Sequence, residues 1–221
     1  MRQLDGQLSS IASPMKRRVF TRAPAGTSAT TAQWKQGWWI EAQVCASPNF
    51  GPRPPGAEVD LVVIHSISLP PGVYGGNAIA QLFTNQLDRN AHPFFEGLRD
   101  LKVSAHFVIR RDGRALQFVS TEFRAWHAGV SVWRGRENCN DYSIGIELEG
   151  LEGLTFEAAQ YRTLVRLLRS LATRHHLHAV VGHEHIAPAR KRDPGPGFQW
   201  ARLARTLGWP RRFFPALAAR R

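Results

Sequence analysis

The spacing of apolar residues predicts buried strands and amphipathic helices from residue 34 onward. Residues 60–65 (Asp-Leu-Val-Val-Ile-His) contain an uninterrupted run of apolar, mostly β-branched side chains that is typical of a strand buried on both faces, and His65 is its last residue. Residues 142–149 alternate instead, so Glu147 and Glu149 share one face and isoleucines occupy the other. The remaining pattern predicts short helices over 79–87 and 91–98, a hairpin from 103–110 and 115–119, a long helix over 156–176, a strand over 179–181 and a terminal helix over 199–207.

Local signals sharpen these predictions at three places. Asp112 and Gly113 are a strong signal for a hairpin turn between the paired strands. Thr155 is the expected N-cap of the long helix, since its hydroxyl can accept a hydrogen bond from the first turn. The segment 182–200 is rich in proline and glycine, which excludes a helix or a central strand. It therefore predicts a rigid, irregular loop of the kind that presents polar side chains to a ligand.

The net charge of +12 is concentrated at the two ends of the chain. Residues 1–33 have little apolar periodicity and carry five Lys or Arg against a single acid, so we expect a disordered basic extension. Residues 208–221 are expected to form a basic C-terminal tail, which leaves one domain over 34–207. Residues 34–200 are nearly balanced, with 18 basic and 16 acidic side chains. Basic tails attract polyanions without sequence preference, so we expect no specific nucleic-acid partner.

The composition is typical of a soluble globular protein. A chain of 221 residues with 43% apolar residues can build one domain with a full core. No apolar run approaches the ~20 residues of a membrane helix, and the first thirty residues lack the apolar stretch of a signal peptide. Two cysteines, Cys45 and Cys139, cannot form a disulfide framework. We therefore expect a cytoplasmic protein; a monomer is favoured, although the sequence leaves the oligomeric state open.

Candidate chemistry comes from polar residues at the ends of predicted elements. His65 and His183 each follow a strand, and Asp193 lies further along the proline-rich loop. Two imidazoles and a carboxylate, with a fourth position open to water, are a catalytic zinc arrangement. Zinc would generate hydroxide near neutral pH, Glu147 could accept the proton of the attacking water, and Lys191 could stabilise an oxyanion. Together these groups indicate a hydrolase of amides or esters.

Spacing alone leaves other histidines open as ligands. The chain has nine histidines and no His-Glu-x-x-His helix. His185 is close enough to His183 in sequence to be a rival ligand. His106 lies among apolar residues within a predicted strand, so a hydrogen-bonded core histidine is the simpler interpretation. His127, beside Trp126, is better placed to line a cleft than to bind a metal.

Four segments of the sequence resemble one known family. They are residues 62–72 (VVIHSISLPPG), 124–129 (RAWHAG), 143–150 (SIGIELEG) and 182–196 (GHEHIAPARKRDPGP). These segments resemble the type-2 N-acetylmuramoyl-L-alanine amidases, and occur in that family's order and spacing. Within the family they resemble the cytoplasmic members that act on 1,6-anhydro-N-acetylmuramyl-L-alanine in Gram-negative bacteria. The resemblance extends from about Gly37 to about Leu203.

The resemblance implies a fold, a metal and a reaction. The implied fold is α/β, a mixed central sheet flanked by helices that is shared with peptidoglycan-recognition proteins. The implied zinc ligands are His65, His183 and Asp193, with Glu147 and Lys191 catalytic. The implied reaction cleaves the amide between the lactyl group of 1,6-anhydro-N-acetylmuramic acid and L-alanine of the stem peptide, in cell-wall recycling. The expected small-molecule partner is therefore an anhydromuropeptide.

Some positions depart from the family pattern where contact with the substrate is expected. Ser66 follows the first ligand, where an asparagine is common, and Lys102 and Asn138 stand where arginines are common. Lysine lacks the planar fork with which arginine grips a carboxylate, and asparagine lacks the charge. The residues that we expect to contact the substrate are Ser66, Lys102, Ala125, Trp126, His127 and Asn138.

Three other functions were weighed. A non-catalytic peptidoglycan-binding module is disfavoured, because relatives on this fold that only bind cell wall have lost a metal ligand and this chain keeps all three. A general amidase acting on intact cell wall is disfavoured by the absence of a recognisable signal peptide. The third function is binding of nucleic acid through the basic ends. In that case, removal of residues 1–33 and 208–221 would abolish binding and leave the metal content unchanged.

Overall fold

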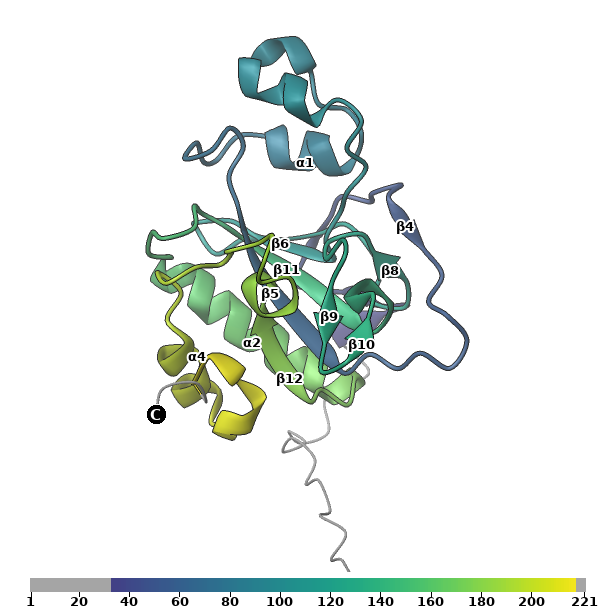
Figure 1. The fold of residues 1–221 in the computed structure, drawn as a ribbon, viewed down its shortest axis with the longest axis vertical. Coiled ribbons are helices and arrows are strands. Elements are labelled where there is room, and N and C mark those ends of the chain that lie inside the picture. Colours follow the sequence, from purple (N-terminus) through teal and green to yellow (C-terminus); the bar gives the residue numbers. More distant parts are fainter. Residues whose placement is uncertain (1–32, 218–221) are drawn as a thin grey trace, which may run out of the picture.

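A six-stranded mixed sheet forms the centre of the molecule (Figure 1). The computed structural model describes residues 33–217, so the basic extension expected over 1–33 lies outside the described residues apart from Gln33. The strands follow the order β12-β5-β11-β6-β7-β3 across the sheet, which confirms the expected mixed α/β fold. Their bounds are β3 Gln43–Val44, β5 Leu61–Ile67, β6 Phe107–Ile109, β7 Ala115–Gln117, β11 Ser143–Glu149 and β12 Ala179–Gly182.

Four neighbouring strands, β12, β5, β11 and β6, run parallel, and β6 then pairs with β7 antiparallel. The register places Glu147 of β11 opposite His65 of β5, and Gly182 of β12 opposite Ile64. Parallel strands bring their carboxyl ends to one edge of a sheet, where α/β proteins bind ligands. The register therefore places these chemically active residues together at one edge.

One face of the sheet packs against α2 (Ala158–Arg174), and α4 (Trp200–Leu207) packs beside α2 (Figure 1). The expected cap at Thr155 is wrong, because α2 begins three residues later. Glu157 caps it instead, in a capping box in which the backbone N–H of Glu157 donates to the side chain of Gln160. The apolar faces predicted for this helix and for β11 meet in one core cluster, which includes Ile144, Ile146, Leu148, Leu164 and Leu168.

The opposite face carries a smaller lobe built from residues 70–101 (Figure 1). The helix predicted over 79–87 forms only over α1 (Ala78–Phe83), because Asn85 adopts a left-handed backbone with φ 59° that no helix continues. The helix predicted over 91–98 is replaced by two 3-10 helices, η2 (Arg89–Ala91) and η3 (Pro93–Leu98). A second core cluster joins this lobe to the sheet through Ile79, Phe83, Phe95, Val108 and Leu116.

The predicted hairpin is present with shorter strands. Ser104 lies in the strand predicted over 103–110, yet its N–H donates to the carbonyl of Trp126, outside the sheet. The turn is confirmed: the N–H of Gly113 donates to the carbonyl of Arg110, and Gly113 has φ 90°. Small two-stranded pairs border the sheet: β1 (Trp34–Lys35) with β2 (Trp38–Trp39), β4 (Phe50–Gly51) with β8 (Arg124–Ala125), and β9 (Val132–Trp133) with β10 (Arg136–Glu137).

The packed body continues past Leu207, where the sequence analysis ended the domain. Trp209, Phe213 and Phe214 are buried in the same cluster as α2, beside the 3-10 helices η5 (Arg211–Phe213) and η6 (Pro215–Leu217). Aromatic burial of this kind attaches the chain end to the core. Within residues 33–217, no helix has both the length and the apolar composition that crossing a membrane requires.

Candidate active site

Three polar side chains converge at the carboxyl ends of β12 and β5. The Nδ1 atoms of His65 and His183 lie 2.9 Å apart. The Oδ2 atom of Asp193 lies 3.1 Å from His65 Nδ1 and 3.2 Å from His183 Nδ1. The structure therefore brings together the three residues that the sequence analysis proposed as ligands, and they form a candidate metal-binding group.

The local sequence explains how Asp193 reaches the histidines. His183 opens a single helical turn, α3 (His183–Ile186), so the expectation of a wholly irregular loop is wrong at its start. The chain then folds back, and the carbonyl of Asp193 accepts a hydrogen bond from the N–H of Glu184 at 3.0 Å. A Cβ on Gly182 would lie 2.7 Å from the ring of Pro194, so the close approach of these two segments requires glycine there.

The rival ligand His185 points away from this group. Its Nδ1 accepts a hydrogen bond from the N–H of Gly182 at 2.8 Å, and its ring packs against Trp200. His183 and His185 are two residues apart in α3, so they point to opposite sides of the helical turn, which sequence spacing could not resolve.

The three donor atoms fit a small divalent ion. Four ligands at about 2.0–2.1 Å from a tetrahedral zinc lie roughly 3.3 Å from one another, close to the separations found here. Burial lowers the pKa of His65 to about 4, so its ring is neutral at pH 7. Burial alone would raise the pKa of Asp193, but hydrogen bonds with His183 and His65 hold it well below its usual value. His65 and Asp193 are thus in the protonation states that coordinate metals.

The ring nitrogens that face away from the cluster have partners of their own. His183 Nε2 donates to the carbonyl of Ala128 at 3.0 Å, which leaves its Nδ1 unprotonated. His65 Nε2 lies 3.0 Å from Nδ1 of His127. Metal-binding histidines commonly use their second nitrogen in this way, because the contact fixes the tautomer and the ring orientation.

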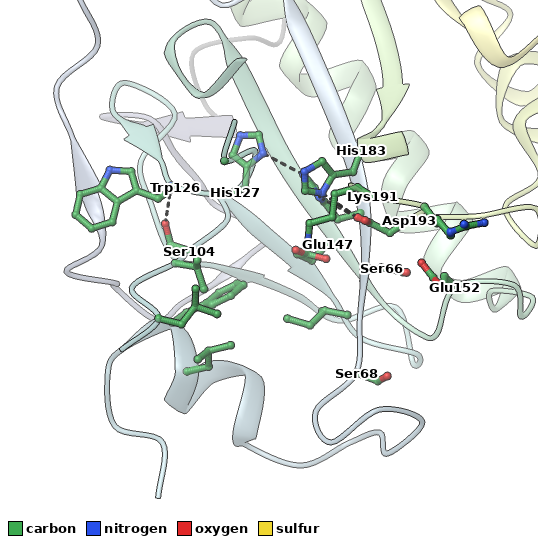
Figure 2. A pocket seen from close by; sticks show the side chains of 18 of the residues that line it. Ser66, Ser68, Ser104, Trp126, His127, Glu147, Glu152, His183, Lys191 and Asp193 are labelled. Carbon is green, nitrogen blue, oxygen red and sulfur yellow. Dashed lines mark hydrogen bonds and ion pairs between the residues drawn. The ribbon is translucent and has the colours of Figure 1, made fainter. Parts of the chain in front are cut away.

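Glu147 and Lys191 face the same space as the candidate ligands (Figure 2). The Oε2 atom of Glu147 is buried and has no hydrogen-bond partner among residues 33–217. Burial and the nearby carboxylate of Asp193 raise its pKa well above the ordinary 4.5, and Lys191 partly offsets the rise. The backbone N–H of Lys191 donates to the carbonyl of Ala187, which extends the turn after α3 and directs the residue inward.

Comparison with known proteins decides the family. A family model described as N-acetylmuramoyl-L-alanine amidase matches residues 55–196, which contain every residue of this cluster. The chain belongs to this amidase family. It is 52% identical over 170 residues to the 1,6-anhydro-N-acetylmuramyl-L-alanine amidase AmpD of Citrobacter freundii, covering 76% of this chain and 91% of that protein. The AmpD of Escherichia coli K12 is 51% identical over 171 residues, covering 76% and 93% of the two chains.

Solved structures of the amidase family show the same fold. A crystal structure of a selenomethionine derivative of AmpD superposes with a TM-score of 0.76 at 51% identity, covering 78% of this chain and 97% of that one. A complex of the E. coli amidase AmiD with anhydro-N-acetylmuramic acid-L-Ala-D-γ-Glu-L-Lys gives 0.50 at 32% identity, covering 69% and 60%. A human peptidoglycan-recognition protein shares the fold alone, with a TM-score of 0.54 at 16% identity.

The candidate ligands, together with Glu147 and Lys191, lie in a cleft of about 840 Å³ between the sheet and the smaller lobe. Of the residues expected to contact substrate, the structure places Ser66, Lys102, Trp126 and His127 in its lining. In the view of Figure 2, Trp126 lies to one side of the Glu147 carboxylate and Glu152 to the other. Arginines at 190 and 192 join Lys102 and Lys191 in the lining, which is therefore rich in cations.

The other two expected contacts lie elsewhere among the described residues. Ala125 is fully buried in the core beneath the smaller lobe, and Asn138 is exposed on a turn where its amide donates to Asp141. Asn140 lines the amidase cleft instead, and its Oδ1 accepts hydrogen bonds from the N–H groups of His127 and Ala128. The two asparagines lie two residues apart in the sequence, and nothing in the local sequence shows which of their side chains points inward.

Proposed function

We propose that this chain is a zinc-dependent amidase that hydrolyses the amide between the lactyl group of 1,6-anhydro-N-acetylmuramic acid and L-alanine of the stem peptide. The observation that carries the proposal is the convergence of two imidazoles and a carboxylate in one cleft with Glu147, whose buried Oε2 has no partner within residues 33–217. The 52% identity to an enzyme named for that bond supports the choice of substrate. Hydrolysis of this bond is a step that returns wall fragments to synthesis, so we assign the protein to peptidoglycan recycling.

Zinc is the proposed ion, held by His65 Nδ1, His183 Nδ1 and Asp193 Oδ2. A mixed set of two imidazoles and one carboxylate is a catalytic donor set for zinc. When bound, zinc supplies Lewis acidity, which lowers the pKa of water to ~7 and polarises a carbonyl oxygen. The residues around the site provide the remaining chemistry.

Glu147 is the proposed general base and then general acid. Its unpartnered Oε2 accepts a proton from the water whose oxygen attacks the lactyl carbonyl carbon. The same carboxyl group then gives that proton to the alanine nitrogen as the carbon–nitrogen bond breaks. Burial suits this exchange, since it raises the pKa of Glu147 above 4.5 and so makes the protonated carboxyl group easier to form.

Lys191 is the proposed stabiliser of the oxyanion that forms on the lactyl carbonyl. Its ammonium is a charge on the wall of the same cleft, and a charge fixed in a site that excludes water stabilises developing negative charge strongly. Lys102 and Arg192, also in the lining, are positioned to attract the carboxylates of an acidic stem peptide.

We further propose a cytoplasmic, monomeric enzyme. One copy of the chain holds every residue of the proposed mechanism, so catalysis needs no second subunit. Both cysteines are free, and Cys139 is buried, as expected in a reducing compartment. Fractionation of the native cells and light scattering of the purified protein test these two statements.

The decisive experiment is a mass-spectrometric assay of zinc-loaded protein on anhydromuramyl-tripeptide and on the same muropeptide without the anhydro ring. We expect release of free tripeptide from the anhydro substrate alone. Equal cleavage of both substrates would make the chain a general cell-wall amidase. Zinc binding without any cleavage would overturn the proposed activity and leave a binding module.

The metal assignment has its own test in Asp193→Ala. We expect a folded protein that retains little or no zinc by plasma mass spectrometry after dialysis, because one of the three donors is gone. Stoichiometric zinc in this variant would show that Asp193 is not a ligand. Circular dichroism of the same sample checks that the variant has folded.

A further inference from the structure

His127 contacts the outward nitrogen of the candidate ligand His65. The two imidazoles meet edge to face, with His65 Nε2 3.0 Å from His127 Nδ1. His127 Nε2 lies 3.2 Å from the hydroxyl oxygen of Ser143, and that hydroxyl lies 2.6 Å from the carbonyl of Cys139. The four groups form a single chain of hydrogen bonds that ends on a backbone carbonyl.

The last acceptor in this series of hydrogen bonds, the carbonyl of Cys139, determines which atom donates in each of the others. A carbonyl can only accept, so the hydroxyl of Ser143 donates to Cys139. The oxygen of Ser143 then accepts from His127 Nε2–H, which makes Nδ1 the unprotonated nitrogen of a neutral His127. That nitrogen can only accept, so His65 carries its proton on Nε2. Its Nδ1 is left with a free lone pair directed at His183 and Asp193.

The surrounding chain is shaped to hold the His127 ring in place. A Cβ on Gly145 would lie 2.4 Å from His127 Cγ, so β11 has a glycine where the imidazole lies against it. Asn140 fixes the backbone by accepting from the N–H of His127 at 3.1 Å. Both the ring and its backbone are therefore positioned by residues outside the cluster, as a precise metal site requires.

We propose that His127 is a positioning residue that holds His65 in the tautomer and orientation that bind the metal. This role is additional to the contact with substrate that the sequence predicts for His127, which also lines the cleft. The inference rests on the proposed zinc site and deepens it. His183 obtains the same control from the carbonyl of Ala128, which no side-chain substitution removes. His65 depends on a side chain, and its orientation is therefore open to mutation.

The first test measures zinc affinity by competition between apoprotein and a fluorescent chelator. His127→Leu removes the acceptor, and we expect its dissociation constant for zinc to rise about 10- to 100-fold. His127→Asn places an amide oxygen near the former Nδ1, and we expect it to stay within about threefold of wild type by restoring the acceptor. His106→Asn is the control for replacing a neighbouring histidine, since the His106 ring lies against His127 but makes no hydrogen bond to the candidate ligands.

The outcomes separate the inference from the proposed function. Wild-type protein that binds no zinc overturns the proposed function, whatever His127 does. Wild-type affinity in His127→Leu, with zinc bound by the unmutated chain, overturns the role of His127 alone. Equal losses of zinc affinity in the Leu and Asn variants also overturn the role of His127, because restoring a hydrogen-bond acceptor for His65 would then make no difference.

A spectroscopic test remains if His127→Leu does not fold. Nitrogen-15 NMR of the zinc-loaded wild type distinguishes the two tautomers of each histidine. We expect His127 to be protonated on Nε2 and unprotonated on Nδ1, and a proton on Nδ1 would overturn the proposal. Where His127→Leu does fold, Ser143→Ala, which removes the group that fixes this tautomer, is expected to lose less zinc affinity than His127→Leu. A larger loss would likewise contradict the assigned order.

Discussion

Two glutamates on strand β11, Glu147 and Glu149, face the same side of the sheet in contrasting surroundings. Glu149 is buried, and its Oε1 accepts hydrogen bonds from Nη1 of Arg110 and from the N–H of Gly75, both at 2.8 Å. Its Oε2 accepts from the N–H of Arg111 at 3.2 Å. Glu147 faces the cleft, and its Oε2 is buried with no partner among residues 33–217.

The contrast separates a structural carboxylate from a reactive one. A buried charge that is paired and hydrogen-bonded contributes to holding the chain in one arrangement, and here Glu149 attaches the loop at Gly75 to the sheet. A buried carboxylate without a partner lowers stability, but it keeps an oxygen free for a proton. The same residue type on the same strand face thus serves stability at one position and chemistry at the other.

Glu147→Gln is the substitution with the largest expected effect. We expect kcat to fall by about 10²- to 10⁴-fold, because the amide cannot accept the proton of the attacking water. Zinc content stays at the wild-type level, since Glu147 is not a ligand. Single-turnover kinetics with anhydromuramyl-tripeptide measure the effect, and near-wild-type turnover would remove Glu147 from the mechanism.

The same variant has an opposite expected effect on stability. Because the folded-state pKa of Glu147 is raised above 4.5, the ionised carboxylate destabilises the folded apoprotein once the pH exceeds that ordinary value. We therefore expect Glu147→Gln to be more stable than wild type in denaturant unfolding with EDTA at pH 7.5. A less stable variant would mean that Glu147 has partners in solution, as Glu149 has here.

Glu149→Gln is expected to lower the free energy of unfolding by about 3–5 kcal/mol, because it leaves the buried Arg110 guanidinium uncompensated. Urea unfolding at pH 7.5 measures this loss. The double variant Arg110→Met with Glu149→Leu is the control, and we expect it to recover much of the stability because no buried charge remains. A single variant as stable as wild type would show that this ion pair contributes nothing.

A smaller effect on stability is expected from the titration of His106, a core histidine whose two ring nitrogens both have hydrogen-bond partners. Burial holds the pKa of His106 well below 6.5, so the unfolded chain takes up a proton below pH 6.5 that the folded chain does not. Stability is therefore retained above pH 6.5 and falls as the pH drops below it. His106 contributes about 1.4 kcal/mol of this fall between pH 7.5 and 5.5. His106→Asn, unfolded in EDTA at both pH values, should show a fall smaller by that amount; an unchanged fall would show that His106 titrates normally.

The sequence alone determined the elements whose patterns are long and regular. Strands β5 and β11 and the long helix α2 were predicted because burial of an apolar face imposes a period that local sequence shows directly. The turn at Gly113 was predictable because its backbone conformation depends on a local residue type. The resemblance of four segments to one amidase family supplied the candidate metal ligands and the proposed reaction.

Only the tertiary structure decided which side chains meet. His185 and His183 are close in sequence, but a single turn of helix points one at the cluster and the other at Trp200. Asn138 and Asn140 belong to one polar turn, yet only Asn140 reaches the cleft. The pairing of His127 with His65 joins residues 62 positions apart. Such contacts depend on strand register and on close approaches at glycine, which are properties of the assembled sheet and leave no periodic signal in the local sequence.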